Sequence, residues 1–300
     1  MIDPRRLRVL RSLADHGTVT AAGAALHLSP SAVSQQLAAL EAESGQELLR
    51  RKGRRVWLTP AGEVLVEHAD SILAELERAE ARMAAHAEGA AGRVEVAAFA
   101  SAITHLVAPA IAALARSAPE VAITVQDAES QRSLSLLLDG AVDLAVIMQF
   151  RPLPDTEDRR IARDELYAEP FDVLLPAGHP AAGEDEVAIG RLSDEEWIMP
   201  LPDNPCRDVL VRHCENAGFR PRIAHSSDDF RAEAALVAAG VGAALIPRSA
   251  LHTVPDGAVL RTLEGEAPVR RVFAAVRRGR EDHPLIATVR RALREGTVRA

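Results

Sequence analysis

A short run of uncharged polar side chains gives the first chemical signal in this 300-residue chain. Ser29 is a suitable N-cap and Pro30 a suitable first residue, so the sequence predicts that a helix begins here. Val33, Leu37 and Leu40 form its apolar stripe. The opposite face carries four hydrogen-bonding residues: Ser31, Ser34, Gln35 and Gln36. A face of this kind suits base edges in a DNA groove better than phosphates.

Basic residues flank this helix on both sides. The upstream cluster is Arg5, Arg6, Arg8 and Arg11, and the downstream cluster is Arg50, Arg51, Arg54 and Arg55. The downstream segment alternates basic and apolar residues around Gly53, which predicts a β-hairpin whose arginines lie along DNA phosphates. A solvated run of charge is the alternative. Val56, Trp57 and Leu58 are expected to return to the core.

The distribution of charge supports a DNA-binding module. The whole chain has 35 Lys/Arg against 43 Asp/Glu, a net charge of −8. Residues 1–60 hold nine of the bases and five of the acids, which gives +4 and leaves 26 against 38, or −12, for the remainder. This asymmetry indicates a basic binding module attached to an acidic regulatory body.

Two further helices are expected before the polar one, over residues 4–16 and 20–28. Leu7, Leu10 and Leu13 of the first helix would support the pair that follows, and the alanines of the second allow close helix packing. We include Thr18, just before the second helix, among the candidate DNA contacts. An ordinary helical hairpin is the plain alternative to a DNA-binding one.

The segment LSPSAVSQQLAALEAESGQELLRRKGRRVWLTPAGEVL resembles the winged helix-turn-helix of LysR-type transcriptional regulators. This resemblance implies a DNA-binding domain over residues 1–59 and sequence-specific binding to double-stranded promoter DNA. It also implies a homodimer or homotetramer and control by a small-molecule effector, with RNA polymerase as a further candidate partner.

Residues 60–89 read as a linker helix. Thr59 is a suitable N-cap and Pro60 a suitable first residue, and the pattern continues to about residue 88. Four apolar residues keep heptad-like spacing: Leu65, Ile72, Leu76 and Met83. A helix of this length with one apolar seam needs a partner, and the resemblance implies that it pairs between two chains. Gly89-Ala90-Ala91-Gly92 then marks a domain boundary.

From residue 92 to residue 300 the sequence alternates strands and helices, which is typical of an α/β domain with parallel sheets. The resemblance implies two Rossmann-like subdomains of the type 2 periplasmic-binding-protein kind. Lobe I is predicted over about 92–164 and 268–300, and lobe II over about 165–267.

Ligands of open α/β sheets bind beyond the carboxyl ends of strands, where helix N-termini expose unpaired N–H groups. Six residues at such ends are the candidate effector contacts: Ser101, Thr104, Gln126, Gln149, Pro202 and Ser227. Helix capping is the alternative role for the two serines. Because helix N-termini favour negative charge, we expect a small polar or anionic effector held by neutral hydrogen bonds.

Cys206 and Cys214 raise a redox alternative, because some LysR-type regulators sense peroxide through two cysteines. Their separation of eight positions on one predicted helix places the Cα atoms about 12 Å apart, which is too far for a disulfide. Cys206 alone, near a helix N-terminus and beside Arg207, would have a lowered thiol pKa. The alternative is that Cys206 lines a pocket and Cys214 lies in the core.

No GxSxG, HExxH or Walker motif occurs, so we expect no enzymatic activity, no metal and no cofactor. A two-lobe solute-binding protein is the competing class of protein. It is disfavoured because the N-terminus lacks the apolar core of a signal peptide and is basic instead. Two cysteines and the lack of a membrane-spanning run predict a cytoplasmic protein without membrane contact.

Overall fold

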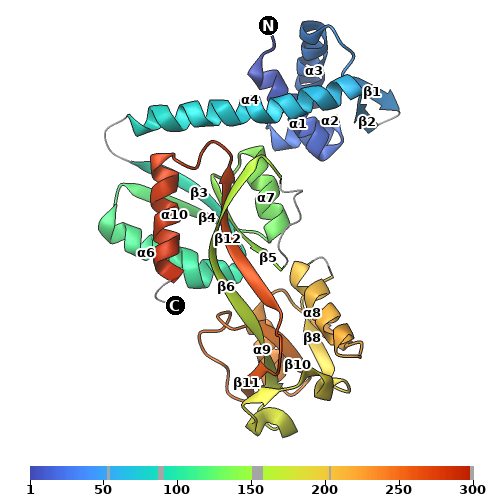
Figure 1. Ribbon diagram of the computed structural model, residues 1–300, viewed down its shortest axis with the longest axis vertical. Helices are drawn as coiled ribbons and strands as arrows, with labels where there is room; N and C mark the ends of the chain where they lie inside the picture. The colour runs from blue at the N-terminus through green and yellow to red at the C-terminus, as the bar shows by residue number, and fades with distance from the viewer. Residues whose placement is uncertain (53–54, 87–90, 151–157, 203, 298–300) are drawn as a thin grey trace.

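The computed structural model describes residues 1–52, 55–86, 91–150, 158–202 and 204–297. A helical N-terminal domain and one long helix lie across one end of the molecule, and two α/β lobes follow below them (Figure 1). The order of elements agrees with a winged helix-turn-helix, a linker helix and a two-lobed α/β domain.

The N-terminal domain consists of three helices and a hairpin: α1 (Pro4–His16), α2 (Val19–Ala25), α3 (Pro30–Ser44), β1 (Leu49–Lys52) and β2 (Arg55–Leu58). Its core is formed by leucines of α1 and α3 together with Leu48, all nearly inaccessible to solvent. The expected caps are present. The Ser29 hydroxyl accepts a hydrogen bond from the Ala32 N–H at 3.2 Å, and Gly45 ends α3 in the left-handed conformation.

Helix α2 is shorter than the predicted 20–28 segment. It begins after Thr18, whose hydroxyl accepts from the Ala21 N–H at 3.1 Å, and it ends at Ala25. The next residues turn sharply, with His27 at a φ of 54°. Gly23 permits this turn, because a Cβ atom there would lie 2.7 Å from the Leu28 carbonyl oxygen.

Helix α4 (Pro60–Ala85) begins at the predicted Thr59 cap and contains 26 residues. The predicted continuation to about residue 88 and the first part of the glycine joint lie outside the described residues. Ala69 of α4 is buried against the N-terminal domain, and Ala81 is buried near the far end of the helix.

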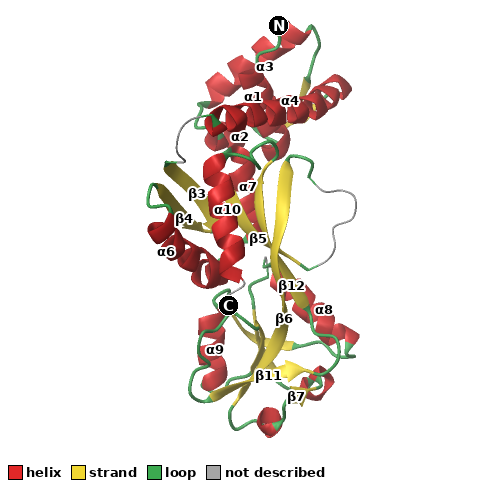
Figure 2. Ribbon diagram, turned by 60° about the vertical axis from the view of Figure 1, so that its left-hand side comes forward, coloured by secondary structure: helices red, strands yellow, loops and turns green. Residues whose placement is uncertain are grey.

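Lobe I has a sheet with helices on both faces (Figure 2). Its strands are β3 (Gly92–Ala98), β4 (Val121–Asp127), β5 (Leu144–Gln149) and part of β12 (Val269–Arg277), in the order β4-β3-β5-β12. Strands β3, β4 and β5 are parallel as predicted, and β12 is antiparallel to β5. Alternate residues of β5 enter separate cores, with Val146 on the α10 side (Pro284–Thr297) and Ile147 on the α7 side (Ser130–Asp139).

One continuous helical stretch covers Ala100–Ser117, formed by α5 (Ala100–Ala102), a π-helical turn (Ile103–Val107) and α6 (Ala108–Ser117). The π-turn falls where the helix faces the other lobe, and such turns frequently mark functional sites. Among the described residues, this stretch alone has the length and apolar composition of a membrane span. In the structure, α6 packs against α10 and β4, so its apolar composition serves the core of lobe I.

Lobe II contains β7 (Glu186–Val187), β8 (Glu196–Met199), α8 (Pro205–Asn216), β9 (Arg222–Ser226), α9 (Phe230–Ala238), β10 (Ala243–Pro247) and β11 (Ala258–Leu263). Two single-turn helices, Pro180–Gly183 and Ile189–Leu192, connect its outer strands. Strand β8 pairs in parallel with β9 and β10, as the predicted strand–helix pattern requires.

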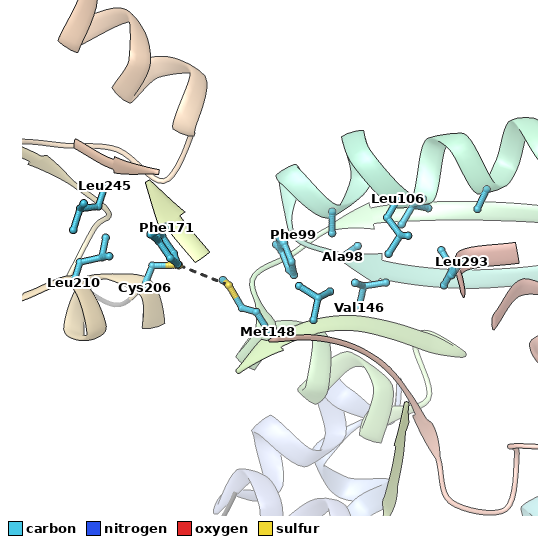
Figure 3. Close-up of a cluster of buried hydrophobic side chains, with 14 of the residues drawn as sticks. Ala98, Phe99, Leu106, Val146, Met148, Phe171, Cys206, Leu210, Leu245 and Leu293 are labelled. Atoms are coloured by element: carbon cyan, nitrogen blue, oxygen red, sulfur yellow. Dashed lines mark hydrogen bonds between the residues drawn. The ribbon is translucent and has the colours of Figure 1, made fainter. Parts of the chain in front are cut away.

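Two long strands join the lobes. Strand β6 (Ile161–Pro176) pairs with β12 over its first part and with β10 and β11 over its second. Buried apolar residues therefore form a cluster that reaches from Leu293 in lobe I to Leu210 and Leu245 in lobe II (Figure 3). At the boundary the Cys206 thiol lies 3.7 Å from the Met148 sulfur, so two side chains from different lobes touch.

Candidate functional site

The polar face of α3 is open to solvent at the positions predicted to read DNA bases. Ser31 and Gln35 are exposed and Ser34 is half-buried. Gln36 differs, because its side-chain oxygen accepts a hydrogen bond from Arg6 Nε at 3.1 Å and is held against α1. Thr18 and Ser29 cap helices, so a role of either residue at DNA would be added to a structural one.

The wing hairpin places Arg50 directly opposite Trp57 in the strand register. Arg50 is exposed, and Trp57 is 47% exposed, so the expectation that Trp57 returns to the core is wrong. Successive residues of a strand point to opposite faces, and Val56 and Leu58 occupy the inner one. The backbone of Arg51 and Arg55 lies in the strands, whereas Arg54 falls outside the described residues.

The predicted seam of α4 is partly accessible. Ile72 is 41%, Leu76 39% and Met83 73% exposed. Leu65 is half-buried against the N-terminal core of its own chain, and the neighbouring Val64 is 56% exposed instead. The exposed apolar stripe of α4 is therefore Ile72, Leu76 and Met83, because Val64 lies about 100° around the helix from these three residues.

Ion pairs attach α4 to lobe I. Glu77 of α4 accepts from Arg277 Nε at 3.0 Å and lies 3.2 Å from Arg280 Nε, and Arg280 also bonds Asp143 at 2.9 Å. Gly279 lies directly against the helix, because a Cβ atom there would collide with the Ala74 carbonyl oxygen. These contacts connect lobe I directly to the linker helix.

Lobe I also touches the N-terminal domain directly. Arg160 Nη1 lies 2.7 Å from Asp15 Oδ2 at the end of α1, and His16 Nε2 lies 2.9 Å from Asp139 Oδ1. The DNA-binding domain and the α/β domain of one chain are thus joined at two points besides the linker helix.

A cavity of about 260 Å³ lies between the lobes. Lobe I contributes residues from the start of the π-turn helix, from α7 and from the end of β5. Lobe II contributes the residues before α8 and α9 and the loop after β10. The residues that line this cavity include Phe99, Ser101, Thr104, Glu129, Met148, Asn204, Cys206, Asp228, Asp229, Phe230, Arg231, His252 and Arg270.

Arg270 is the central cation of this cavity and is fully buried. Its Nε donates to Glu169 Oε1 at 2.7 Å, and its Nη1 donates to the Ser101 hydroxyl at 3.2 Å. The guanidinium lies over the rings of Phe99 and Phe230, at 5.3 and 5.8 Å from their centroids. Its Nη2 also lies 2.7 Å from Glu169 Oε1, so the Glu169 carboxylate contacts the guanidinium at two nitrogens.

Glu129 is the most perturbed carboxyl group of the cavity. Burial, together with the nearby carboxylates of Asp228 and Asp127, raises its pKa to about 7. It precedes α7 but does not cap that helix, and within the described residues its Oε2 has no hydrogen-bond partner. A half-protonated carboxyl group therefore faces the cavity at neutral pH.

The structure brings together only part of the predicted effector set. Ser101 and Thr104 line the cavity, whereas the other four do not. Gln126 is exposed because β4 is an edge strand, and Pro202 is also exposed. Gln149 lies opposite Arg271 in the register, and the Ser227 hydroxyl is engaged with the backbone of Asp229. Gln126 and Pro202 lie outside this cavity, and their contact with an effector stays a prediction.

The cavity residues that sequence analysis missed are Glu129, Asp228 and Arg270. The sequence pattern could have identified Arg270 as buried, because Arg270 alternates with Val272 and Ala274 on the buried face of β12. Glu129 directly precedes α7, and Asp228 directly follows Ser227, which was selected instead.

Both cysteines are buried in α8 and are free thiols. Burial raises the pKa of each thiol to about 12, so the predicted lowering for Cys206 is wrong. Arg207 donates to the Pro200 carbonyl oxygen and the Ser226 hydroxyl. Cys206 lines the cavity and Cys214 lies in the core. Over the described ranges, no group of three metal-ligating side chains is found.

A helix-turn-helix with an open polar face, a long linker helix and a ligand-sized cavity in an α/β domain define a DNA-binding transcriptional regulator, not an enzyme. The chain belongs to the LysR family. Residues 4–63 match the bacterial regulatory helix-turn-helix proteins of the lysR family, and residues 87–297 match the LysR substrate binding domain.

Individual relatives agree with this assignment. A probable hydrogen peroxide-inducible genes activator of Mycobacterium avium is 31% identical over 264 residues, 87% of this chain and 83% of that protein. A full-length OxyR variant from Pseudomonas aeruginosa has a TM-score of 0.68 at 23% identity, covering 98% of this chain and 95% of that one. CbnR complexed with its target DNA has a TM-score of 0.56 at 24% identity, covering 99% and 100%. These two structures support the fold.

The DNA-binding surface leads to a paired prediction. Arg50→Ala should weaken binding to operator and to unrelated DNA alike and reduce the salt slope by about 1, because a phosphate contact is lost. Gln35→Ala should leave the slope unchanged and reduce discrimination for the operator by about 1–3 kcal/mol. Fluorescence anisotropy on both DNAs over a salt series measures both quantities. The reverse pattern would contradict the assignment of wing and recognition helix.

Proposed function

We propose that this LysR-family regulator binds promoter DNA as a homodimer or homotetramer in the cytoplasm and responds to a small polar effector in the interlobe cavity. The proposal divides the chain into a DNA-binding domain (1–59), a linker and dimerisation helix (60–89) and an effector domain (92–300). The proposal also includes a contact with RNA polymerase, which is supported by the family resemblance alone.

The cavity is the observation that carries the effector proposal. Its walls come from both lobes, and it combines apolar surface with a few convergent polar groups, as small-molecule sites do. The Oε2 atom of Glu129 has no hydrogen-bond partner among the described residues, so it is a polar atom that a ligand can satisfy. An effector can shift the lobes only by binding one arrangement more tightly than another.

The route from cavity to DNA follows the ion pairs of lobe I. A change in the lobe arrangement moves the end of β12 and the loop after it, which hold Glu77 of α4. The Arg160–Asp15 pair carries the same movement to α1. In a dimer, rotation of two linker helices changes the spacing of the two recognition helices.

The exposed stripe of α4 leads to a prediction about assembly. Ile72→Glu should leave a monomer with weak operator binding, because it places a charge in the proposed apolar seam. Ser71→Glu is the matched control, because Ser71 precedes Ile72 in the chain, is exposed and lies outside the stripe. Sedimentation velocity measures the mass of each variant. An Ile72→Glu protein that sediments like the parent would exclude this seam.

The cavity leads to a prediction about effector control. Thr104→Trp should fill the cavity and abolish the response to effector while operator binding is kept, since among the described residues the Thr104 hydroxyl bonds only the Ala100 carbonyl oxygen. Gln126→Ala is the control, because Gln126 lies outside the cavity. Footprinting on the upstream DNA with a panel of small polar metabolites reads the response. A metabolite that changes the Thr104→Trp footprint as it does the wild type would place the effector elsewhere.

A thiol-based redox sensor is the second candidate, and the position of Cys206 in the cavity wall favours it. Relatives named as hydrogen peroxide-inducible genes activators add to this reading. The thiol pKa of about 12 opposes it, because roughly one thiol in 10⁵ is ionised at neutral pH and the thiolate is the nucleophile. Both cysteines also lie on one helix, too far apart to join without unfolding it.

Peroxide treatment separates the two candidates. We expect stoichiometric hydrogen peroxide to leave Cys206 unmodified on the time scale of minutes and to leave operator binding unchanged. Mass spectrometry after trapping of sulfenic acid measures the modification of Cys206, and fluorescence anisotropy measures operator binding. Cys206→Ser is the control. Rapid sulfenic acid formation at Cys206, coupled to a changed footprint that Cys206→Ser abolishes, would favour the redox sensor.

A further inference from the structure

The charges that line the interlobe cavity do not balance. Arg270 is neutralised by Glu169, with its Nε donating to Glu169 Oε1 at 2.7 Å. Arg231 is neutralised by Asp229 through two hydrogen bonds of 3.1 and 3.0 Å. The acids Glu129 and Asp228 also line the cavity, and no ion pair joins either of them to a basic residue in the described part of the chain. The cavity therefore carries surplus negative charge.

Each of these two carboxyl groups has an oxygen left for a ligand. Glu129 Oε2 is buried and has no hydrogen-bond partner among the described residues. Asp228 accepts from the Leu201 N–H at 2.9 Å and from Asn204 Nδ2 at 3.0 Å, both at its Oδ1. Within the described residues no donor bonds its Oδ2. Two carboxyl groups from different lobes thus line the same cavity.

The surroundings make an additional negative charge unfavourable here. Glu233, on the first turn of α9, is fully buried, and burial together with the charges of Asp228 and Asp229 raises its pKa to about 9. Glu233 is therefore already neutral through protonation, and Glu129 is partly protonated at neutral pH. A ligand cation relieves the same repulsion that protonation relieves.

We propose that the effector of this regulator carries an ammonium group, which Glu129 and Asp228 hold between the lobes. An acidic or hydroxyl group of the same molecule is directed to the Ser101 hydroxyl, which lines the cavity and can donate to it, so a small amino acid is the simplest member of the class. The inference rests on the proposed function, because it concerns the same cavity. It replaces the anionic effector expected from the helix N-termini, since both cavity arginines are already paired.

Binding of an ammonium group must be linked to protons. The groups that face Glu129 are Asp127 at the end of β4, Asp228 before α9, Cys206 on α8 and Arg270 on β12. Only the ionised form of Glu129 attracts the ligand, and its pKa is about 7. Affinity should therefore rise with pH up to about 7, and binding at pH 6 should release a proton.

The experiment uses full-length protein and three sets of probes: the common L-amino acids, their 2-hydroxy acid counterparts without nitrogen, and linear amines. Thermal shift identifies binders, and calorimetry in buffers of different ionisation enthalpy counts the released protons. Glu129→Gln and Asp228→Asn remove the charges with little change of shape. Glu120→Gln, an exposed acid at the other end of β4, is the control, and Thr104→Trp blocks the cavity.

We expect nitrogen-bearing probes alone to bind, with affinity roughly 10- to 100-fold lower in Glu129→Gln and unchanged in Glu120→Gln. Glu129→Gln should also lose the pH dependence and the proton release. Operator binding by each variant checks that it is folded.

Binding of the hydroxy acids but not the amino acids, blocked by Thr104→Trp, would overturn the inference and leave the proposed function intact. Binding that Thr104→Trp does not affect would overturn both. Failure of every nitrogen-bearing probe at millimolar concentration would overturn the inference, and the footprinting experiment would then decide the proposed function.

Discussion

The antiparallel pairing of β6 with β12 is the constraint on which the α/β half of this regulator depends. Strand β6 pairs with β12 over its first part and with lobe II strands over its second, and the register of β6 and β12 places Arg270 beside Glu169 where the chain crosses between the lobes. Neither charge is accessible to solvent, so each needs the other. A slip of one residue would turn Arg270 outward and leave Glu169 buried without its cation. Register, lobe arrangement and cavity wall are therefore fixed together.

This pairing also decides the chemistry of the cavity. A buried arginine at a ligand site usually indicates an anionic ligand, but here Glu169 has already neutralised its charge. The surplus charge of the cavity belongs to Glu129 and Asp228 on the other walls. Burial and the nearby carboxylates of Asp228 and Asp127 raise the pKa of Glu129, so the proposed cation binds in competition with protons.

Sensing and DNA binding are connected by side chains at the far end of β12. Arg277 and Arg280 hold Glu77 of the linker helix, and Gly279 allows the backbone to approach it closely. Because β12 also carries Arg270, one strand contacts the effector cavity at one end and the linker helix at the other. This continuity gives the proposed control of DNA binding a physical path through packed and ion-paired groups.

The sequence by itself determined the elements whose signals are local. Ser29, Pro30 and Gly45 bound the recognition helix, Thr59 and Pro60 begin the linker helix, and strand–helix alternation gave the α/β class, because caps and periodicity act within a few residues. Only the tertiary structure decided the ligand site. Gln126 was selected as a strand-end residue, yet β4 lies at the edge of its sheet. Arg270 and Glu129 are 141 positions apart and meet through strand order and register, which no local pattern encodes.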